Sequence, residues 1–578
     1  MPAILIVIMC LAAFVPAYCF YARHIQNKIL GLDPKRRTPA HLKRDGIDFV
    51  PSNRMVLFGH HFASIAGLGP IVGPAIAAVW GWLPALLWVV FGTIFLGAVH
   101  DFVAGGISIR FGGRSIGDLT GDIIGPRARI LFLLIIFFVV GLFMGAFAII
   151  VGGLLDAIPN SVIPVFGLIA IALVMGLFLY KAKMPLWLAT IFGVGLMALA
   201  IFLGLEYKID GISQTTWIPI LLVYSLVASV LPVWLLLQPR DYLNSFQLYA
   251  GLGMLFLGII FTAPVMQAPL TSNVLGGEST PPVFPIMFMI VACAAISGFH
   301  SLVSSGTTAR QVNNEKDMRF ITYGGMLTEG FFGMIVLLTC TAGIAYADWK
   351  GFYITEGFSA VAANPLKIFL QGGSNLLHGI GLSKELGKLL LTVMAVGFAM
   401  TTLDTATRLL RFNVEEIAGR LGMNFIRKNR YIAALIAILW IGFFVLITAA
   451  GNTKGGVIKA SDNPLWPIAG MSNQLMGALG LLTASVYLYK LRRPTLFTLI
   501  PMVIMLTLTL WAVADTIIKQ FSSLTGPNPN YGVLCVALAL FALGIWLAVE
   551  AILKAIQLKR GGRDESEEPP QADAVNGE

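Results

Sequence analysis

The sequence contains 578 residues, of which 57% are hydrophobic and only 12% are charged. An ordinary soluble domain is roughly 45–50% apolar and about 25% charged, so this composition excludes a water-soluble globular protein and predicts an all-α integral membrane protein. The net charge of +10 comes from lysine and arginine residues whose positions along the chain set membrane orientation. We therefore predict no nucleic-acid partner.

Fifteen apolar segments follow one another along the chain. Each is long enough to cross a hydrocarbon core of about 30 Å as a helix that rises about 1.5 Å per residue. The first has no basic residue ahead of it, which favours a retained helix over a cleaved signal peptide. The predicted spans are residues 3–21, 55–79, 83–109, 130–155, 162–180, 185–205, 217–237, 246–266, 283–308, 320–346, 384–403, 431–450, 465–489, 495–517 and 531–553.

Fifteen spans place their connections alternately on the two sides of the membrane. Lysine and arginine are divided unequally between these two sides. Of the 39 basic residues, 31 lie on one side and 8 on the other. Because basic connections stay in the cytoplasm, we expect the N-terminus outside and the C-terminus in the cytoplasm. The longest outer connection, residues 347–383, is expected to contain a short helix of unknown role.

The second span is the most informative segment, because its residues 59–74 combine four glycines with two prolines near the middle of the bilayer. Proline and glycine disfavour a continuous helix there. The freed backbone groups need protein, water or a bound solute as partners, and the ends of two half-helices attract charged ligands. A kinked packing helix is the alternative. The candidate substrate-binding residues in this span are His60, His61, Ser64, Gly67, Gly69, Pro70 and Gly73.

Ser229 and Pro232 place a second interruption near the middle of the seventh span. Interrupted helices at matching positions of two opposed halves are typical of secondary transporters. We therefore predict that spans two to six and spans seven to eleven form inverted repeats, with Ser229 and Pro232 at the substrate site. A lone proline is equally compatible with a simple kink.

The ninth span is rich in hydroxyl groups. Ser301, Ser304 and Ser305 share one helix face, at positions i, i+3 and i+4. Three hydroxyl oxygens on one face are able to coordinate a hard cation or to conduct a proton. They are equally compatible with a packing helix whose serines donate to backbone carbonyls one turn earlier.

Ionisable residues inside a bilayer are costly and usually functional. Besides the two histidines of the second span, the spans contain His100, Asp101, His300, Glu329 and Asp404. Because histidine titrates near neutral pH, we expect these residues to hold the coupling ion or relay a proton. Asp101 is alternatively a structural partner of a cation, and Asp404 an interfacial ion pair with Arg408 or Arg411.

The motifs of several enzyme classes are missing, namely a phosphate loop, Cys-x-x-Cys, His-Glu-x-x-His and Gly-x-Ser-x-Gly. We therefore predict no catalytic residue and no cofactor, and we expect an ion gradient of H⁺ or Na⁺ rather than ATP as the energy source. The alternatives are a channel, a membrane enzyme that uses His60, His61 and Asp101, and a nutrient sensor without flux.

The segment FGHHFASIAGLGPIVGPAIA at residues 58–77 resembles the signature of the carbon starvation protein A family. The likeness continues through HD at 100–101, SLVSSGTTARQ at 301–311 and TTLDTATR at 401–408. The resemblance implies a bacterial inner-membrane carrier of pyruvate or small peptides with five-plus-five inverted repeats, as in the amino acid, polyamine and organocation transporters. It also implies a sodium site, here at Ala66, Ser301, Ser304 and Ser305.

Residues and resemblance together predict an ion-gradient-driven, proton-coupled transporter that takes up pyruvate or a similar small carboxylate under carbon starvation, with small peptides as the alternative substrate. Residues 1–54 would hold the first helix and a basic loop, and residues 55–404 the transport core. Peripheral helices at 405–556 and a disordered tail at 557–578 complete the chain. The lipid bilayer is the other expected partner, and the oligomeric state is left open.

Overall fold

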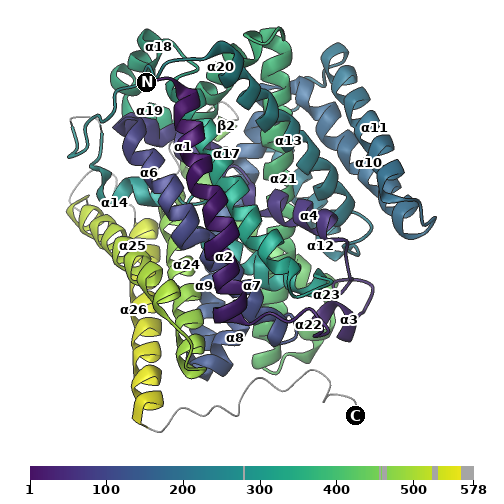
Figure 1. Ribbon diagram of the computed structural model, residues 1–578, viewed down its shortest axis with the longest axis vertical. Helices are drawn as coiled ribbons and strands as arrows, with labels where there is room; N and C mark the ends of the chain where they lie inside the picture. The colour runs from purple at the N-terminus through teal and green to yellow at the C-terminus, as the bar shows by residue number, and fades with distance from the viewer. Residues whose placement is uncertain (278–279, 455–456, 459–464, 524–530, 561–578) are drawn as a thin grey trace.

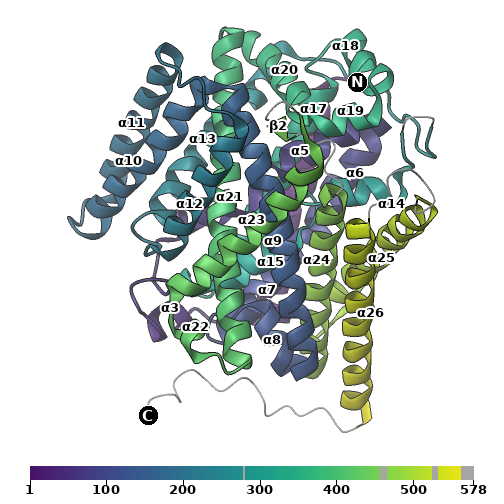
Figure 2. The same cartoon turned by 180° about the vertical axis from the view of Figure 1, so that it is seen from behind.

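The structure is a computed structural model that describes residues 1–277, 280–454, 457–458, 465–523 and 531–560. Its helices run along one long axis, and Figures 1 and 2 show them from opposite sides. Within the described residues, 11 helices are long and apolar enough to cross a membrane, or up to 12 if the bent pair Arg54–Ala66 and Gly69–Trp80 counts as one span. An all-helical, multi-pass membrane protein is therefore confirmed, whereas the number of fifteen spans and the inverted repeat stay predictions.

The first half of the chain contains an N-terminal helix, the bent pair and several long helices, with η marking 3₁₀ or π turns. Its elements are α1 (Ala3–Pro16), η1 (Ala17–Tyr21), α2 (Ala22–His24), η2 (Ile25–Leu30), α3 (Pro39–Leu42), α4 (Arg54–Ala66), α5 (Gly69–Ala77), η3 (Ala78–Trp80), α6 (Trp82–Gly92), η4 (Thr93–Gly97), α7 (Ala98–Arg110), α8 (Ile116–Ile123), α9 (Pro126–Ala157), η5 (Pro159–Ser161), α10 (Val162–Tyr180), α11 (Leu186–Glu206), α12 (Gln214–Val230) and α13 (Leu237–Thr262).

The second half begins with another interrupted segment and ends with three long helices. Its elements are α14 (Val283–Ile290), α15 (Gly298–Val303), η6 (Ser304–Thr308), α16 (Ala309–Gln311), η7 (Arg319–Tyr323), α17 (Gly324–Thr341), α18 (Tyr346–Lys350), η8 (Gly351–Thr355), α19 (Gly357–Ala363), α20 (Pro365–His378), α21 (Lys384–Arg420), α22 (Asn424–Lys428), α23 (Arg430–Asn452), the antiparallel strands β1 (Thr453–Lys454) and β2 (Val457–Ile458), α24 (Leu465–Lys490), α25 (Leu496–Ser523) and α26 (Tyr531–Arg560).

The predicted break in the second span is confirmed. Helix α4 begins after Asn53, whose side chain accepts a hydrogen bond from the first turn at 2.9 Å. It ends at Ala66 because Gly67 adopts a φ of +49°, which residues with a Cβ rarely adopt. Helix α5 restarts at Gly69 with Pro70 in its first turn, where a missing N–H is tolerated. The two halves differ in direction by 43°.

The predicted break in the middle of the seventh span is wrong. Helix α12, which carries Ser229, ends at Val230, and Pro232 lies in the turn before α13 begins at Leu237. The helix ends there because proline lacks an N–H and keeps the preceding residue extended, and Leu231 accordingly has a ψ of 149°.

The second broken segment is instead the ninth predicted span, which was expected to be one helix. Residues 291–297 between α14 and α15 are not helical, although they contain neither proline nor glycine. Side chains from distant parts of the chain satisfy their backbone. The Thr93 hydroxyl donates to the carbonyl of Ala294 at 2.7 Å, and the Trp88 indole N–H donates to that of Val291 at 3.1 Å.

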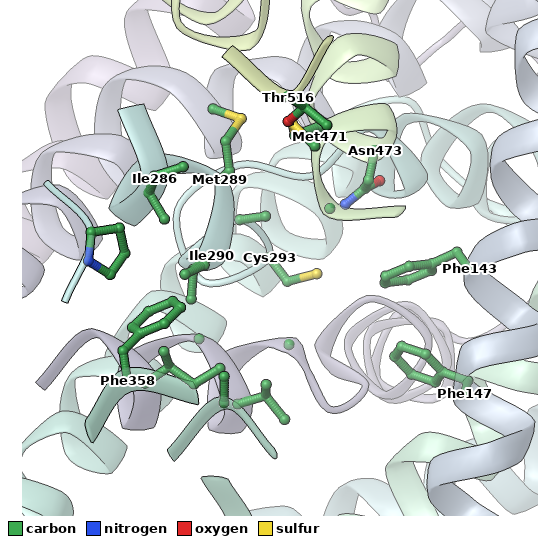
Figure 3. Close-up of a pocket in the computed structure, with 18 residues that line it drawn as sticks. Phe143, Phe147, Ile286, Met289, Ile290, Cys293, Phe358, Met471, Asn473 and Thr516 are labelled. Carbon is green, nitrogen blue, oxygen red and sulfur yellow. The ribbon is translucent and has the colours of Figure 1, made fainter. Parts of the chain in front are cut away.

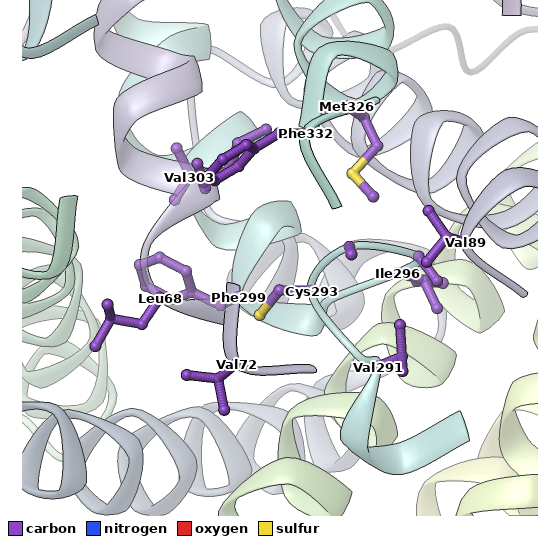
Figure 4. Close-up of a cluster of buried hydrophobic side chains, with 14 of the residues drawn as sticks. Leu68, Val72, Val89, Val291, Cys293, Ile296, Phe299, Val303, Met326 and Phe332 are labelled. Atoms are coloured by element: carbon purple, nitrogen blue, oxygen red, sulfur yellow. The ribbon is translucent and has the colours of Figure 1, made fainter. Parts of the chain in front are cut away.

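The start of α15 is capped by α24. Oδ1 of Asn473 accepts hydrogen bonds from the Phe299 amide at 2.9 Å and from the Ser297 hydroxyl at 3.2 Å. Apolar side chains of both breaks belong to one buried cluster, in which Figure 4 shows Leu68 near Phe299. Tertiary contacts therefore produce the second break.

The connections gather at the two ends of the bundle. Helices α3, α8 and α22 lie at one end, whereas α18, α19 and α20 lie at the other (Figures 1 and 2). The basic connections predicted for the cytoplasm thus share one end. The long connection 347–383 is at the opposite end and contains several helices, among them α20 with 14 residues, where one short helix was expected. Which end faces the cytoplasm stays a prediction.

Two helix pairs, α10 with α11 and α25 with α26, stand at opposite edges of the bundle (Figure 1). Helix α11 exposes large apolar side chains such as Trp187, at 65%, and Ile191, at 63%, which suits contact with lipid. The predicted core boundary at residue 404 falls inside the single helix α21, and the division into four parts stays a prediction. Residues 561–578 of the predicted tail lie outside the described residues.

Replacing Gly298 by alanine should destabilise the fold, because the new Cβ would overlap the Asn473 carbonyl oxygen and the Gly477 amide nitrogen of α24. Overpacking costs about 1–3 kcal/mol, so the melting temperature of the detergent-purified protein should fall by several degrees. The matched control is Gly253→Ala on α13, where the new Cβ meets nothing within 4 Å. Equal melting temperatures of the two variants would contradict the packing of the second break against α24.

Candidate functional site

The break between α4 and α5 frees backbone carbonyls, and side chains of two other helices contact them. The Thr402 hydroxyl of α21 donates to the Ser64 carbonyl at 3.2 Å, and Nε2 of His300 on α15 lies 3.2 Å from the Ile65 carbonyl. The hydroxyls of Ser64 and Thr405 are 3.1 Å apart. The predicted site residue Ser64 therefore joins α4 to α21 in a fully buried region.

Four predicted ionisable residues meet beside this break, and we name them the Asp101 cluster: His100, Asp101, His300 and Glu329. Oδ1 of Asp101 lies 2.8 Å from Nδ1 of His100, and Oδ2 lies 3.2 Å from Nδ1 of His300. Nε2 of His300 is 3.6 Å from a carboxylate oxygen of Glu329. All four side chains are at most 1% exposed. Helices α7, α15 and α17 bring them together.

Several polar atoms of the Asp101 cluster are unpaired. Among the described residues, neither carboxylate oxygen of Glu329 accepts a hydrogen bond, and Nε2 of His100 has no hydrogen-bond partner. Buried polar atoms are normally paired. The cluster therefore has unused capacity for a proton or a small polar ligand.

His61 faces this region from α4. Its Nδ1 lies 2.8 Å from the Thr308 hydroxyl, whereas its Nε2 has no hydrogen-bond partner in the described part of the chain. The side chain is fully buried. Its predicted contact with substrate stays a prediction.

A second buried network, which we name the Arg240 cluster, contains His60, Tyr224, Arg240, Asp241 and Asp404. Nδ1 of His60 lies 2.5 Å from Oδ2 of Asp241, and Arg240 donates to Oδ1 of Asp241 at 2.6 Å. Arg240 also pairs with Asp404, which accepts a hydrogen bond from the Tyr224 hydroxyl at 2.7 Å. The exposed fraction of the side chain is at most 3% for each of His60, Arg240, Asp241 and Asp404.

Arg240 and Asp241 are the site residues that the sequence analysis missed. The eighth span was predicted to begin at residue 246, but α13 begins at Leu237 and carries both residues in its first turns. Pro239 is the signal that would have placed the helix start earlier, because proline is favoured in the first turn. Asp404 therefore pairs with Arg240 in the interior instead of forming an interfacial pair.

Asp48, in the connection before α4, pairs with Arg408 at 2.5 Å and with Arg411 at 3.2 Å. Burial alone would raise the pKa of Asp48, but Arg411, Arg408 and Arg310 outweigh burial and lower this pKa to about 2. Arg408 also donates to the carbonyl of Ala228 near the end of α12 at 3.0 Å. The connection that enters α4 is thus fastened to both α12 and α21.

A cavity of about 270 Å³ opens between the two broken segments, and Figure 3 shows its lining. Gly69 and Gly73 of α5 line one side, as predicted for a substrate site. Phe147 of α9 and Cys293 of the second break line others, and Asn473 contributes one of the few polar side chains. The cavity is therefore mostly apolar and adjoins both breaks.

The remaining predicted substrate residues lie outside this lining. His60 belongs to the Arg240 cluster, Gly67 packs against α21, and Pro70 is buried in the first turn of α5. Ser229 donates to a carbonyl of its own helix at 2.8 Å, and Pro232 lies in the following turn. Their contact with substrate stays a prediction.

The predicted sodium site does not present three free hydroxyls. Ser301 donates to the Gly298 carbonyl at 2.7 Å and Ser305 to the Ser301 carbonyl at 2.5 Å, whereas the Ser304 hydroxyl is unpaired within the described residues. Ala66 is the last residue of α4. No three His, Cys, Asp or Glu side chains in the described segments form a group suited to a metal ion. Sodium binding stays a prediction.

Helix α4 thus contacts two buried ionisable clusters, and its broken end adjoins an apolar cavity. Ionisable groups at such depth in a membrane protein are typical of ion pathways and proton relays. Broken helices at a solute cavity are typical of secondary transporters. The arrangement is chemically suited to bind a proton next to a bound solute.

Comparisons with known proteins identify the family of this chain and relatives that are named as transporters. The family model described as Carbon starvation protein CstA matches residues 2–350 and 352–512. The peptide transporter CstA of Campylobacter jejuni subsp. jejuni is 34% identical over 567 residues, which cover 88% of this chain and 79% of that protein. The pyruvate/proton symporter BtsT of Escherichia coli K12 is 31% identical over 601 residues, which cover 90% of this chain and 82% of that protein.

A solved structure of a manganese transporter from Eremococcus coleocola is 14% identical, with a TM-score of 0.47, and covers 88% of this chain and 99% of that one. The sequence relatives are named as transporters, which supports a membrane transporter. Matched along nearly its whole length by the family model, this chain belongs to the carbon starvation protein CstA family.

Proposed function

We propose that this chain is a proton-coupled secondary transporter that takes up pyruvate or a similar small carboxylate across the bacterial inner membrane under carbon starvation. The observation that carries the proposal is the contact between His300 of the Asp101 cluster and the Ile65 carbonyl at the break of α4. This contact joins ionisable groups to the broken helix whose second half lines the cavity.

We assign the transported proton to Glu329, because its carboxylate oxygens accept no hydrogen bond within the described residues. An ionised Glu329 attracts His300, which lies 3.6 Å away, and protonation removes that attraction. His300 is then free to leave the Ile65 carbonyl, so that the break rearranges. Proton binding is thereby linked to access to the cavity.

A small carboxylate suits the cavity for two reasons. Gly69 lines it at the start of α5, where the positive end of the helix dipole attracts anions. The apolar remainder of the lining suits the methyl group of pyruvate. The relatives' names support peptides equally, and a peptide would place its ammonium group against Glu329 or Asp101.

We further infer that the inverted repeats are divided differently from the expectation drawn from the sequence. If the edge pair α10–α11 is an insertion, the first set of five is α4–α5, α6–α7, α9, α12 and α13. The second set is α14–α15, α17, α21, α23 and α24. Both sets then start with a broken helix, as in transporters with inverted repeats. The family resemblance implies a sodium site between the first helix of the first repeat and the third helix of the second repeat. On this division those helices are α4 and α21, so a sodium-coupled alternative would use the Ser64 carbonyl with the hydroxyls of Thr402 and Thr405.

Proteoliposomes that contain the purified protein should accumulate labelled pyruvate when a proton gradient is imposed and not when only a sodium gradient is imposed. A labelled dipeptide, tested in parallel, distinguishes the two substrate classes. Accumulation driven by sodium alone would replace the proton as the coupling ion. Rapid equilibration without accumulation would indicate a channel, and absence of any flux would indicate a sensor or another solute.

Glu329→Gln should abolish accumulation driven by the proton gradient but leave exchange of labelled for unlabelled substrate largely intact, because exchange needs no net proton movement. We expect the initial rate of accumulation to fall at least about tenfold, equivalent to about 1.4 kcal/mol. Glu206→Gln, the same chemical change at the exposed end of α11, is the matched control. Accumulation at the wild-type rate in Glu329→Gln would exclude Glu329 as the coupling group.

Gly73→Val should abolish both accumulation and exchange. A Cβ at this position would lie 2.8 Å from the Ile290 carbonyl oxygen and 3.1 Å from Cα of Val291, so the two broken segments would be forced apart at the cavity. Gly195→Val on α11, where a Cβ meets nothing within 4 Å, controls for insertion and yield. Normal exchange in a well-inserted Gly73→Val protein would contradict the placement of the substrate in this cavity.

A further inference from the structure

We infer that His60 holds a second exchangeable proton, at a buried site that it forms with Asp241 and that two glutamines connect to the end of helix α10. The role of this proton in coupling rests on the proposed function. The site itself follows from charge balance and hydrogen bonding.

With both of its carboxylates ionised, the Arg240 cluster is electrically balanced only when His60 is charged. A single guanidinium, that of Arg240, pairs with two carboxylates, those of Asp241 and Asp404. With a neutral His60, one negative charge remains uncompensated among side chains that are at most 3% exposed. A buried uncompensated charge is strongly destabilising. An imidazolium at His60, whose Nδ1 lies 2.5 Å from Asp241, cancels it.

The charged and titratable groups on this side of α4 come from three helices. They are Asp241 and Arg240 on α13, Asp404 on α21 and Tyr224 on α12. On its other side, α4 packs against α15 and α17, which carry His300 and Glu329 of the Asp101 cluster, and His61 faces Thr308 of η6. The two adjacent histidines of α4 thus belong to different surroundings.

A chain of amide side chains leads from His60 towards the end of α10. Nε2 of Gln311 lies 3.5 Å from Nε2 of His60, and Oε1 of Gln311 accepts a hydrogen bond from Gln238 at 2.5 Å. Oε1 of Gln238 in turn accepts one from the Tyr180 hydroxyl at 2.5 Å. Tyr180 is the last residue of α10 and is partly exposed. The chain therefore links the buried imidazole to a less buried hydroxyl.

The hydrogen bonds between Tyr180 and His60 can run in either direction, because the two side chains that connect them, Gln238 and Gln311, are amides. In the orientation described, Gln311 donates towards His60, which suits a neutral imidazole. Rotation of both amides reverses the direction, so that the Gln311 oxygen accepts from the Nε2–H of an imidazolium and its NH₂ group donates to Gln238. The oxygen and nitrogen of an amide are nearly interchangeable in position. Gln238 also donates to the Ser52 hydroxyl at 2.6 Å, and after the rotation this hydroxyl would turn from the Val50 carbonyl to donate to Gln238. Both charge states of His60 therefore find partners through side-chain rotation alone, as an exchangeable proton site requires.

Protonation of His60 would strengthen the attachment of α4 to α13. His60 lies on the first half of the broken segment, whereas Asp241 lies on a continuous helix. Together with the Asp101 cluster, this site gives α4 two protonatable contacts. Loading and release of a proton at His60 would thus act on the same helix as protonation of Glu329.

The test is ¹⁵N NMR of the histidine side chains in the full-length protein in detergent. The chain has 7 histidines, and His60→Gln identifies the His60 signal by its loss. At about pH 7.5 we expect both ring nitrogens of His60 to carry protons, because the Asp241 carboxylate lies 2.5 Å from Nδ1. In Asp241→Asn, His60 should be neutral at the same pH.

Asp101→Asn, the same chemical change in the other cluster, should leave the His60 signal in place and is the matched control. A neutral His60 in the wild-type protein at about pH 6 would overturn the inference, as would an imidazolium that persists in Asp241→Asn. A His60 that stays charged up to about pH 10 would show a permanent rather than an exchangeable proton. If Asp241→Asn does not fold, the wild-type titration alone decides. The measurement requires no transport, so its failure is distinct from failure of the proposed function.

Discussion

Two helix breaks deep inside the protein release backbone groups that have no water to bind, and the arrangement of the surrounding helices follows from this constraint. At the first break, His300 meets the carbonyl of Ile65 and Thr402 meets that of Ser64. At the second, Asn473 caps the new helix start. Helices α15, α21 and α24 are therefore held against the breaks by hydrogen bonds as well as by apolar packing.

The same lack of water explains why the ionisable residues are clustered. An isolated buried charge is costly, so each finds partners of opposite sign or hydrogen-bonding groups. Asp101 lies between two histidines, and Arg240 lies between two carboxylates. Both clusters reach α4, whose preceding connection is in turn fastened through Asp48. The position of α4 thus depends on charges that protonation changes, which is the physical basis for proposing proton coupling.

The sequence by itself determined the fold class and the first break. Composition and apolar length define membrane helices because lipid admits no unpaired backbone, and Gly67 with Pro70 interrupts α4–α5 through local backbone geometry alone. It also identified the members of the Asp101 cluster, because ionisable residues stand out in apolar spans. In both cases the signal lies within one short segment.

Only the tertiary structure decided the second break and the pairing of charges. Residues 291–297 contain neither proline nor glycine, and their backbone is satisfied by Thr93 and Trp88, about 200 residues away in sequence. The partner of Asp404 proved to be Arg240, which lay in a segment predicted as a connection. Helix breaks and ion pairs of this kind depend on groups that only the packing of helices brings within hydrogen-bonding distance, so no local pattern specifies them.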